Sequence, residues 1–140
     1  VARHLVTWPY TICAAPDYLD RHPPITHPSQ LHAHRWLHFL PVRTTLQHGG
    51  ESYFLDVADS IACMHLAAVC SLTESGFGLS LQVGGEVREK IVQGRLKTVL
   101  PEWTLPPVSL YLVTPYRVQS AKTEAAVRIF TESFAKEADA

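Results

Sequence analysis

The side chains best suited to chemistry in this sequence are a group of histidines in its N-terminal part. His32 and His34 are separated by one residue, and His22, His27 and His38 lie close by in the sequence. On a strand, a His-x-His pair points both rings to one face, which is one way to hold a metal. Zinc sites, however, usually add cysteine or carboxylate ligands in a closed tetrahedral set, and none is spaced for one here. We therefore expect exposed histidines, no metal site and no cofactor.

The three cysteines offer a second possible chemistry. Cys13, Cys63 and Cys70 contain no CxxC pair, and each lies in an apolar run. Cys63 and Cys70 are spaced by about two turns of a helix, which would place them on one helical face. A redox sensor needs an exposed thiol of low pKa. An apolar setting favours packing, so we expect buried free thiols in a reducing compartment.

The sequence contains no recognisable catalytic constellation. It lacks a GxSxG nucleophile elbow, an HExxH zinc motif and a Walker loop. The candidate acids are spread over predicted turns at Asp17, Asp20, Asp56 and Asp59. We therefore expect that the chain is not an enzyme.

Length and charge restrict the remaining functions. The 140 residues fit one domain of ordinary globular composition, with 46% hydrophobic and 18% charged residues. The net charge is −1, and the basic residues form no cluster of the kind that holds DNA phosphates. No apolar stretch approaches the ~20 residues that span a bilayer. The chain begins at Val1 rather than at Met, and its start reads as mid-protein, so we expect a fragment.

Strand-like and helix-like segments alternate along the chain. This alternation predicts an α/β architecture with mixed open sheets flanked by helices. The predicted strands are residues 10–15, 35–40, 52–57, 79–81, 96–100 and 108–113, and the predicted helices begin at Pro16, at Pro28 and in the segments 61–72, 86–93 and 120–138.

Three of these helices have distinctive patterns. Residues 61–72 are apolar nearly all round, which predicts a helix buried between layers and capped by Asp59. In the segment 86–93, Glu86 and Lys90 can pair on the outer face, and Gly94 ends the helix. The last helix is capped by Ser120, and its predicted inner stripe is Val127, Phe130, Phe134 and Ala138.

Four segments, in order, resemble the effector domain of LysR-type transcription regulators. They are VARHL with CAAPDYL (1–5 and 13–19), PSQLHAH (28–34), SGFGLSL with QGRL (75–81 and 93–96), and VLPEW with LYLVTP (99–103 and 110–115). Each segment alone is weak, but their joint order makes chance resemblance implausible.

The resemblance implies a fold like that of type II periplasmic binding proteins, in which two α/β lobes enclose a ligand cleft. Residues 16–113 would form the second lobe. Residues 1–15 and 114–140 would form the crossover strands and the remnant of the first lobe, including the final helix. Hinges would lie at Ala15, Pro16, Thr114 and Pro115. The start of the first lobe and the DNA-binding winged helix-turn-helix would precede Val1.

The resemblance also suggests where a small-molecule effector, possibly an organic acid, would bind. Ser60 would donate to a ligand carboxylate at a helix N-terminus, although simple capping by Asp59 and Ser60 is the commoner role of such residues. Phe39, Leu40 and Pro41 would form an apolar wall, although core packing would also explain them. Thr114 would contact the ligand from the second crossover.

As a family member, the chain would work in the cytoplasm as a homodimer or tetramer and would reach DNA only through the missing N-terminal domain. It would not bind a membrane. Two other functions remain open from the sequence: a periplasmic-type solute-binding protein of the same fold, and a small α/β enzyme.

Overall fold

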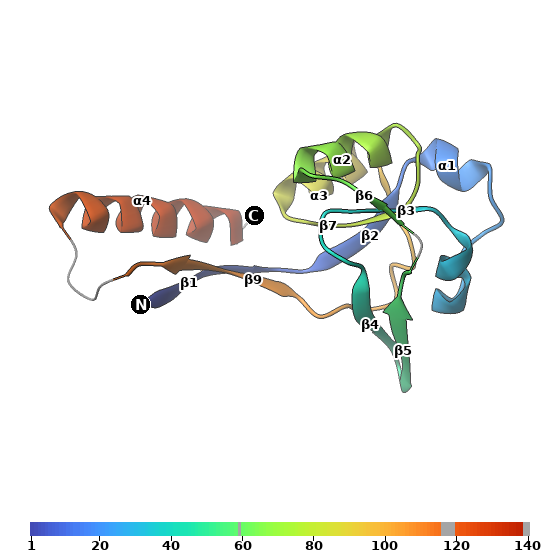
Figure 1. Ribbon diagram of the computed structural model, residues 1–140, viewed down its shortest axis with the longest axis horizontal. Helices are drawn as coiled ribbons and strands as arrows, with labels where there is room; N and C mark the ends of the chain where they lie inside the picture. The colour runs from blue at the N-terminus through green and yellow to red at the C-terminus, as the bar shows by residue number, and fades with distance from the viewer. Residues whose placement is uncertain (59, 116–119, 139–140) are drawn as a thin grey trace. The chain divides into compact units, whose positions relative to one another are not determined.

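The computed structural model describes residues 1–58, 60–115 and 120–138 (Figure 1). The chain divides into two compact units, each described here by itself. The larger unit is Tyr10–Pro106, and the smaller unit combines Val1–Pro9 with Pro107–Ala140. No helix in the described ranges is long and apolar enough to cross a membrane.

The larger unit combines antiparallel and parallel strand pairs with short helices. Its elements are β2 (Tyr10–Ala14), α1 (Pro16–Asp20), the 3-10 helix η1 (Pro28–Ala33), β3 (Trp36–His38), β4 (Arg43–His48), β5 (Glu51–Asp56), β6 (Ser60–Ala62), α2 (Leu66–Glu74), β7 (Ser80–Val83), α3 (Gly85–Val92) and β8 (Lys97–Thr98). Strand β2 lies between β7 and β8 and is antiparallel to both, β3 is parallel to β6, and β4 and β5 form a hairpin. The predicted mixed α/β architecture is therefore confirmed.

Backbone hydrogen bonds link the β3–β6 pair to the strand segment that leads into β7. The Leu37 N–H donates to the Leu79 carbonyl, and the Leu79 N–H donates to the Arg35 carbonyl, both at 2.8 Å. Gly78 makes this approach possible, because a Cβ on Gly78 would lie 2.4 Å from the Arg35 carbonyl oxygen. The turn at residues 76–78, called the GFG turn below, therefore joins the β3–β6 pair to the sheet that contains β7.

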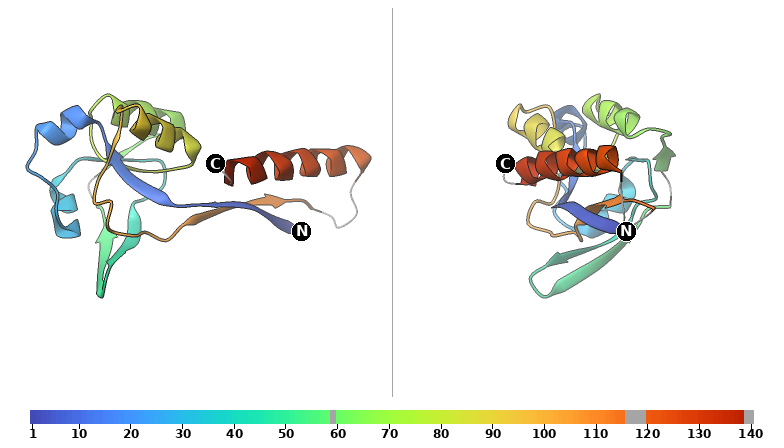
Figure 2. Two further views of the ribbon diagram at one scale, coloured as in Figure 1. Left: turned by 180° about the vertical axis from the view of Figure 1, so that it is seen from behind. Right: turned by 90° about the vertical axis from the view of Figure 1, so that its left-hand side faces the viewer.

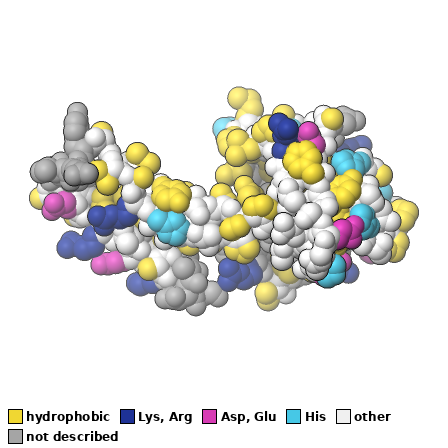
Figure 3. Space-filling model, turned by 90° about the horizontal axis from the view of Figure 1, so that it is seen from below, with side chains coloured by type: hydrophobic (Ala, Val, Ile, Leu, Met, Phe, Trp, Pro, Cys, Tyr) yellow, Lys and Arg dark blue, Asp and Glu magenta, His cyan; other side chains and the backbone are white. Residues whose placement is uncertain are grey.

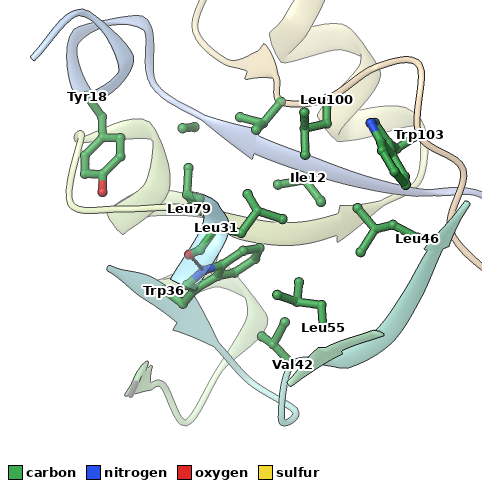
Figure 4. Packing of buried hydrophobic residues seen from close by; sticks show 12 residues of the cluster. Ile12, Tyr18, Leu31, Trp36, Val42, Leu46, Leu55, Leu79, Leu100 and Trp103 are labelled. Carbon is green, nitrogen blue, oxygen red and sulfur yellow. Dashed lines mark hydrogen bonds between the residues drawn. The ribbon is translucent and has the colours of Figure 1, made fainter. Parts of the chain in front are cut away.

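The core of the larger unit lies between β2, β3 and the β4–β5 hairpin (Figure 4). Trp36 is fully buried in it, and its Nε1–H donates to the Leu31 carbonyl at 2.9 Å. Ile12, Leu46 and Leu55 pack into the same cluster. These contacts explain why β2, η1, β3 and the hairpin occupy fixed positions in this unit.

Local signals predicted several elements correctly. Pro16 begins α1, as a proline at a first helical position should. Strand β5 confirms the predicted strand 52–57 to within one residue at each end, and Gly49 and Gly50 form the turn before it, although β4 itself was not expected. Gly94 has φ +77° just beyond the end of α3, which is the left-handed conformation expected at a helix stop.

The predicted helix over residues 61–72 is wrong in its first part and correct from Leu66 onward. Ser60–Ala62 form strand β6, and α2 begins only at Leu66, with His65 as its N-cap residue. Backbone pairing with β3 holds the first part of the apolar run extended, and this tertiary contact overrides helix propensity. Helix α2 buries only one side, through Val69 and Thr73.

This shift also changes the interpretation of the cysteines. Cys63 precedes α2, so it shares no helical face with Cys70. Cys13 is buried, as expected, whereas Cys63 and Cys70 are half-buried. Burial raises the pKa of Cys13 to about 12 and also raises the pKa of Cys70, so neither thiol has the low pKa of a redox sensor.

In the smaller unit, β1 (Ala2–Trp8) and β9 (Val108–Val113) form an antiparallel pair, and α4 (Ala121–Ala138) runs alongside it (Figure 2). Ser120 caps α4 as predicted, because its Oγ accepts from the Thr123 N–H at 3.3 Å. Phe134 packs against Trp8 with ring centroids 5.9 Å apart, and Val127 is half-buried. Phe130 was expected on the same inner stripe but is 49% exposed, and the side chain of Ala138 lies outside the described part.

A cluster of charges connects α2 to α3. Glu74, the last residue of α2, pairs with Lys90 at 3.2 Å and with Arg95. Lys90 also pairs with Glu86 at 3.4 Å, which confirms the predicted pair on α3. Desolvation acts to raise the pKa of Glu74, but the hydrogen bonds and charges of Arg95 and Lys90 together lower it.

Replacing this carboxylate should remove part of the pH dependence of stability. A folded-state pKa below the ordinary value of 4.5 means that the contribution of Glu74 is complete above pH 4.5 and is lost as the pH falls through the folded-state pKa. We expect Glu74→Gln to lower the thermal midpoint at pH 7, and the gap to wild type to close under strongly acidic conditions. Thermal unfolding followed by circular dichroism at both pH values, with Glu102→Gln as the control, tests this. If the thermal midpoints of Glu74→Gln and wild type differed by the same amount at both pH values, the lowered pKa of Glu74 would be contradicted.

Candidate functional site

The parallel pair β3 and β6 brings two chain segments to one edge of the larger unit. His38, the last residue of β3, is in register with Ala62, the last residue of β6. The Cys63 N–H donates to the His38 carbonyl at 2.8 Å, so the segments after both strands leave the same edge. In open α/β sheets, ligands bind at the carboxyl ends of the strands. This edge, formed by Phe39, Leu40, Cys63 and Met64, is called the carboxyl edge below.

The carboxyl edge is apolar and exposed. Met64 is 85% exposed, Leu40 66% and Phe39 46%, and Leu66 at the start of α2 is exposed as well. Pro41 is also exposed. Core packing therefore does not account for Phe39 and Leu40, and their predicted role as an apolar wall remains a prediction.

Polar groups accompany this apolar surface. Helix α2 starts next to it, and the side chain of His65 does not cap the free N–H groups of its first turn. A helix N-terminus carries partial positive charge and attracts carboxylates. The Nδ1 atom of His38 is buried and has no hydrogen-bond partner among the described residues. The carboxyl edge therefore combines apolar surface with a helix N-terminus, which favours an anion.

Ser60 does not take part in this arrangement. It is the first residue of β6, at the amino end of the strand, and not at the start of a helix as predicted. Asp59, its expected partner as a cap, lies outside the described residues. The residues that lead into α2, Met64 and the N-cap residue His65, were missed because the nearly continuous apolar run placed them inside the predicted helix. The polar His65 was the only local sign of a helix start.

The predicted hinge residues fall inside the two units. Ala15 is the buried N-cap residue of α1, and Pro16 is the first residue of that helix. Thr114 follows β9, and its N–H donates to the Val1 carbonyl at 2.9 Å. Pro115 is exposed next to it. The two units divide after Pro9 and after Pro106. The predicted hinges and the predicted lobe limits of 16–113 stay predictions.

The histidines are less exposed than expected. Of the five histidines in this group, His32 is exposed, whereas His22, His27, His34 and His38 are half-buried. His32 lies on η1 and not on a strand, so the strand geometry of a His-x-His pair does not apply. His27 Nε2 instead pairs with Glu51 at 2.7 Å. Within the described residues, no three metal-ligating side chains come together.

Charged side chains are dispersed over the face drawn in Figure 3. On this face, lysines and arginines lie among acidic and uncharged side chains. This distribution agrees with the scattered basic residues of the sequence.

Comparison with known proteins gives a family match over nearly the whole chain. The model described as the LysR substrate binding domain matches residues 1–135. The probable HTH-type transcriptional regulator SinR of Salmonella typhimurium is 30% identical over 113 residues, which cover 76% of this chain and 36% of SinR. The HTH-type transcriptional regulator PtxR of Pseudomonas aeruginosa is 28% identical over 124 residues, which cover 86% of this chain and 39% of PtxR. The chain thus spans well under half the length of these curated relatives.

Solved structures agree on the fold. Full-length AphB, the Vibrio cholerae virulence activator, superposes with a TM-score of 0.83 at 24% identity, covering 96% of this chain and 48% of that protein. The regulatory domain of CrgA from Neisseria meningitidis gives a TM-score of 0.74 at 22% identity, covering 96% of this chain and 68% of that domain. The predicted fold, lobes of the type II periplasmic-binding-protein kind, is confirmed.

Proposed function

We propose that this chain, which belongs to the LysR substrate-binding domain family, senses a small molecule on behalf of a longer transcription regulator. Both curated relatives are transcriptional regulators. The resemblance of the four sequence segments to LysR-type regulators is therefore confirmed. The ligand, the oligomeric state and the contact with DNA are proposed here.

The observation that carries the proposal is the exposed apolar carboxyl edge next to the α2 N-terminus. A small organic acid fits it best. Its carboxylate would accept from the free N–H groups at the start of α2, which the helix dipole favours. Its apolar part would cover Phe39, Leu40 and Met64, which are otherwise exposed to water.

Signal transmission would follow from differential binding. A ligand shifts an equilibrium only by binding one arrangement of the protein more tightly than another. In the proposed regulator, a homodimer or tetramer, the ligand would favour one arrangement and thereby reposition DNA-binding parts outside this chain. With a net charge of −1, this chain would not itself hold DNA. The proposed regulator would act in the cytoplasm.

The two alternative functions have less support. A solute-binding protein shares the fold, but both curated relatives are regulators. An enzyme would also be compatible with the fold, because a fold alone does not define a function. We propose that the chain has no catalytic activity of its own.

A thermal-shift titration with benzoate, salicylate, acetate and succinate tests the proposed ligand class on the 140-residue chain. A ligand at 100 times its Kd stabilises the folded state by about 2.7 kcal/mol, so at least one acid should raise the thermal midpoint in a saturable way. Met64→Glu should weaken that acid about tenfold or more, because like charges close together near a protein surface repel by roughly 1–4 kcal/mol.

The matched control is Phe54→Glu on β5, which puts the same charge on a side chain that is 59% exposed and outside the carboxyl edge. This variant should bind the acid as wild type does. An equal loss of affinity for the acid in Met64→Glu and Phe54→Glu, or no stabilisation of wild type by any acid, would count against an organic-acid site at the carboxyl edge.

A further inference from the structure

The larger unit contains a cavity at the opposite end of the β3–β6 pair. Its volume is about 710 Å³, within the usual size range of small-molecule sites. Arg35, just before β3, and Ser60, at the start of β6, line it. Because β3 and β6 are parallel, this amino edge is separate from the carboxyl edge.

The lining is rich in hydrogen-bond donors and positive charge. Two arginines, three histidines, a tyrosine and two serines contribute to it, together with the apolar side chains of Ile61 and Phe77. The described residues of the lining include no aspartate or glutamate. A small anion is therefore the ligand that this lining favours.

Arg21 is held in place at the cavity. Its Nη2 donates to the Gly76 carbonyl at 2.8 Å, and its Nε donates to the Asp17 carbonyl at 3.2 Å. A guanidinium carries five N–H donors, so these two bonds leave others for a ligand. The bonds orient the group in advance, which lowers the entropy cost of binding.

The histidine side of the cavity is also fixed. His22 stacks on Tyr18 with ring centroids 4.1 Å apart, and His34 Nδ1 lies 2.9 Å from the Tyr18 hydroxyl oxygen. The centroids of the His22 and His34 rings are 5.2 Å apart. Burial, followed by the nearby His22, lowers the pKa of His34, and the negative charge of a bound anion would act in the opposite direction by favouring the protonated form.

The backbone of Arg35 is anchored while its side chain remains exposed. Its N–H donates to the Tyr18 hydroxyl at 3.4 Å, and its carbonyl accepts from Leu79 at 2.8 Å. Arg35 forms no ion pair among the described residues.

We propose that this cavity is a second binding site, for a small organic anion. The oxyanion head group lies among the arginines and histidines, and the apolar part contacts Ile61 and Phe77. The side chains of Ile61 and Phe77 are 43% and 48% exposed, so a ligand would cover surface that now faces water.

Phenyl phosphate is a suitable probe because it joins a dianionic head to an aromatic ring. Titration of the 140-residue chain, followed by isothermal calorimetry and by the ring resonances of the histidines in NMR spectra, should show saturable binding that shifts His22 and His34. Inorganic phosphate and phenol, which each carry only half of the probe, should both bind more weakly. Phosphate binding as tight as phenyl phosphate would refute the apolar part of the proposal.

Arg35→Ala is the decisive variant, because the side chain is exposed and its removal leaves the core intact. We expect it to weaken phenyl phosphate by about tenfold or more, the effect of losing one charged hydrogen bond. Arg88→Ala, which removes an exposed arginine on α3 that does not line the cavity, should leave the affinity unchanged. No saturable binding to wild type, or equal affinity in Arg35→Ala, would overturn the proposal.

The two sites can be tested separately. Met64→Glu at the carboxyl edge should leave phenyl phosphate binding intact, and Arg35→Ala should leave the organic-acid response intact. If Met64→Glu alone abolished phenyl phosphate binding, the probe would occupy the carboxyl edge, and the second site would be refuted without harm to the proposed function.

Discussion

Trp36→Ala is expected to lower the free energy of unfolding by about 3–5 kcal/mol, the usual cost of emptying a buried aromatic site. Trp36 is fully buried at the centre of the core, and its indole N–H donates to the Leu31 carbonyl. Because domains are stable by only about 5–15 kcal/mol, this loss should remove much of the stability of the larger unit. Urea unfolding followed by far-ultraviolet circular dichroism measures it.

Two further variants separate packing from hydrogen bonding at this position. Trp36→Phe keeps an aromatic body but lacks the indole N–H, so it should cost less than Trp36→Ala. Phe54→Ala removes an aromatic ring that is 59% exposed and should change stability by no more than about 0.5 kcal/mol. If Trp36→Ala proved as mild as Phe54→Ala, Trp36 would not be the centre of the core.

Gly78→Ala should have the second large effect, although it adds only one methyl group. The new Cβ would lie 2.4 Å from the carbonyl oxygen of Arg35, which is backbone and is already bonded to the Leu79 N–H. The strands must separate to relieve the contact, at a cost of about 1–3 kcal/mol or more. The same movement would displace Arg35, so Gly78→Ala should also weaken phenyl phosphate.

Gly85→Ala is the matched control for this prediction. A Cβ on Gly85 would meet nothing within 4 Å, and alanine is about 1 kcal/mol better than glycine inside a helix. Gly85→Ala should therefore be neutral or slightly stabilising in thermal unfolding. Equal stability of Gly78→Ala and wild type would show that β3 and the GFG turn are not as closely packed as described.

The sequence alone determined those elements whose causes are local. Pro16 sets the backbone angle that starts α1, Ser120 supplies the acceptor that caps α4, and Gly94 tolerates the left-handed angle that ends α3. In each case the physical cause lies within a few residues of its effect. The four ordered segments likewise predicted the family and the fold class.

The fate of the apolar run 61–72 depends on long-range contacts. Its composition suits a buried helix, but pairing with β3, which lies distant in the sequence, turns its start into β6 and moves the helix start to Leu66. Backbone hydrogen bonds to a partner strand are not encoded in local periodicity. For this reason Ser60 was predicted at a helix N-terminus, while Met64 and His65 were overlooked.

The two candidate sites depend on tertiary structure in the same way. The carboxyl edge exists because β3 and β6 end side by side, and the cavity at their amino edge gathers Arg21, Arg35 and Gly76 from three separate segments. The sequence determined which side chains were available and which local elements carry them. Long-range strand pairing and core packing decided which of those side chains meet, because proximity in space is set by contacts between residues far apart in the chain.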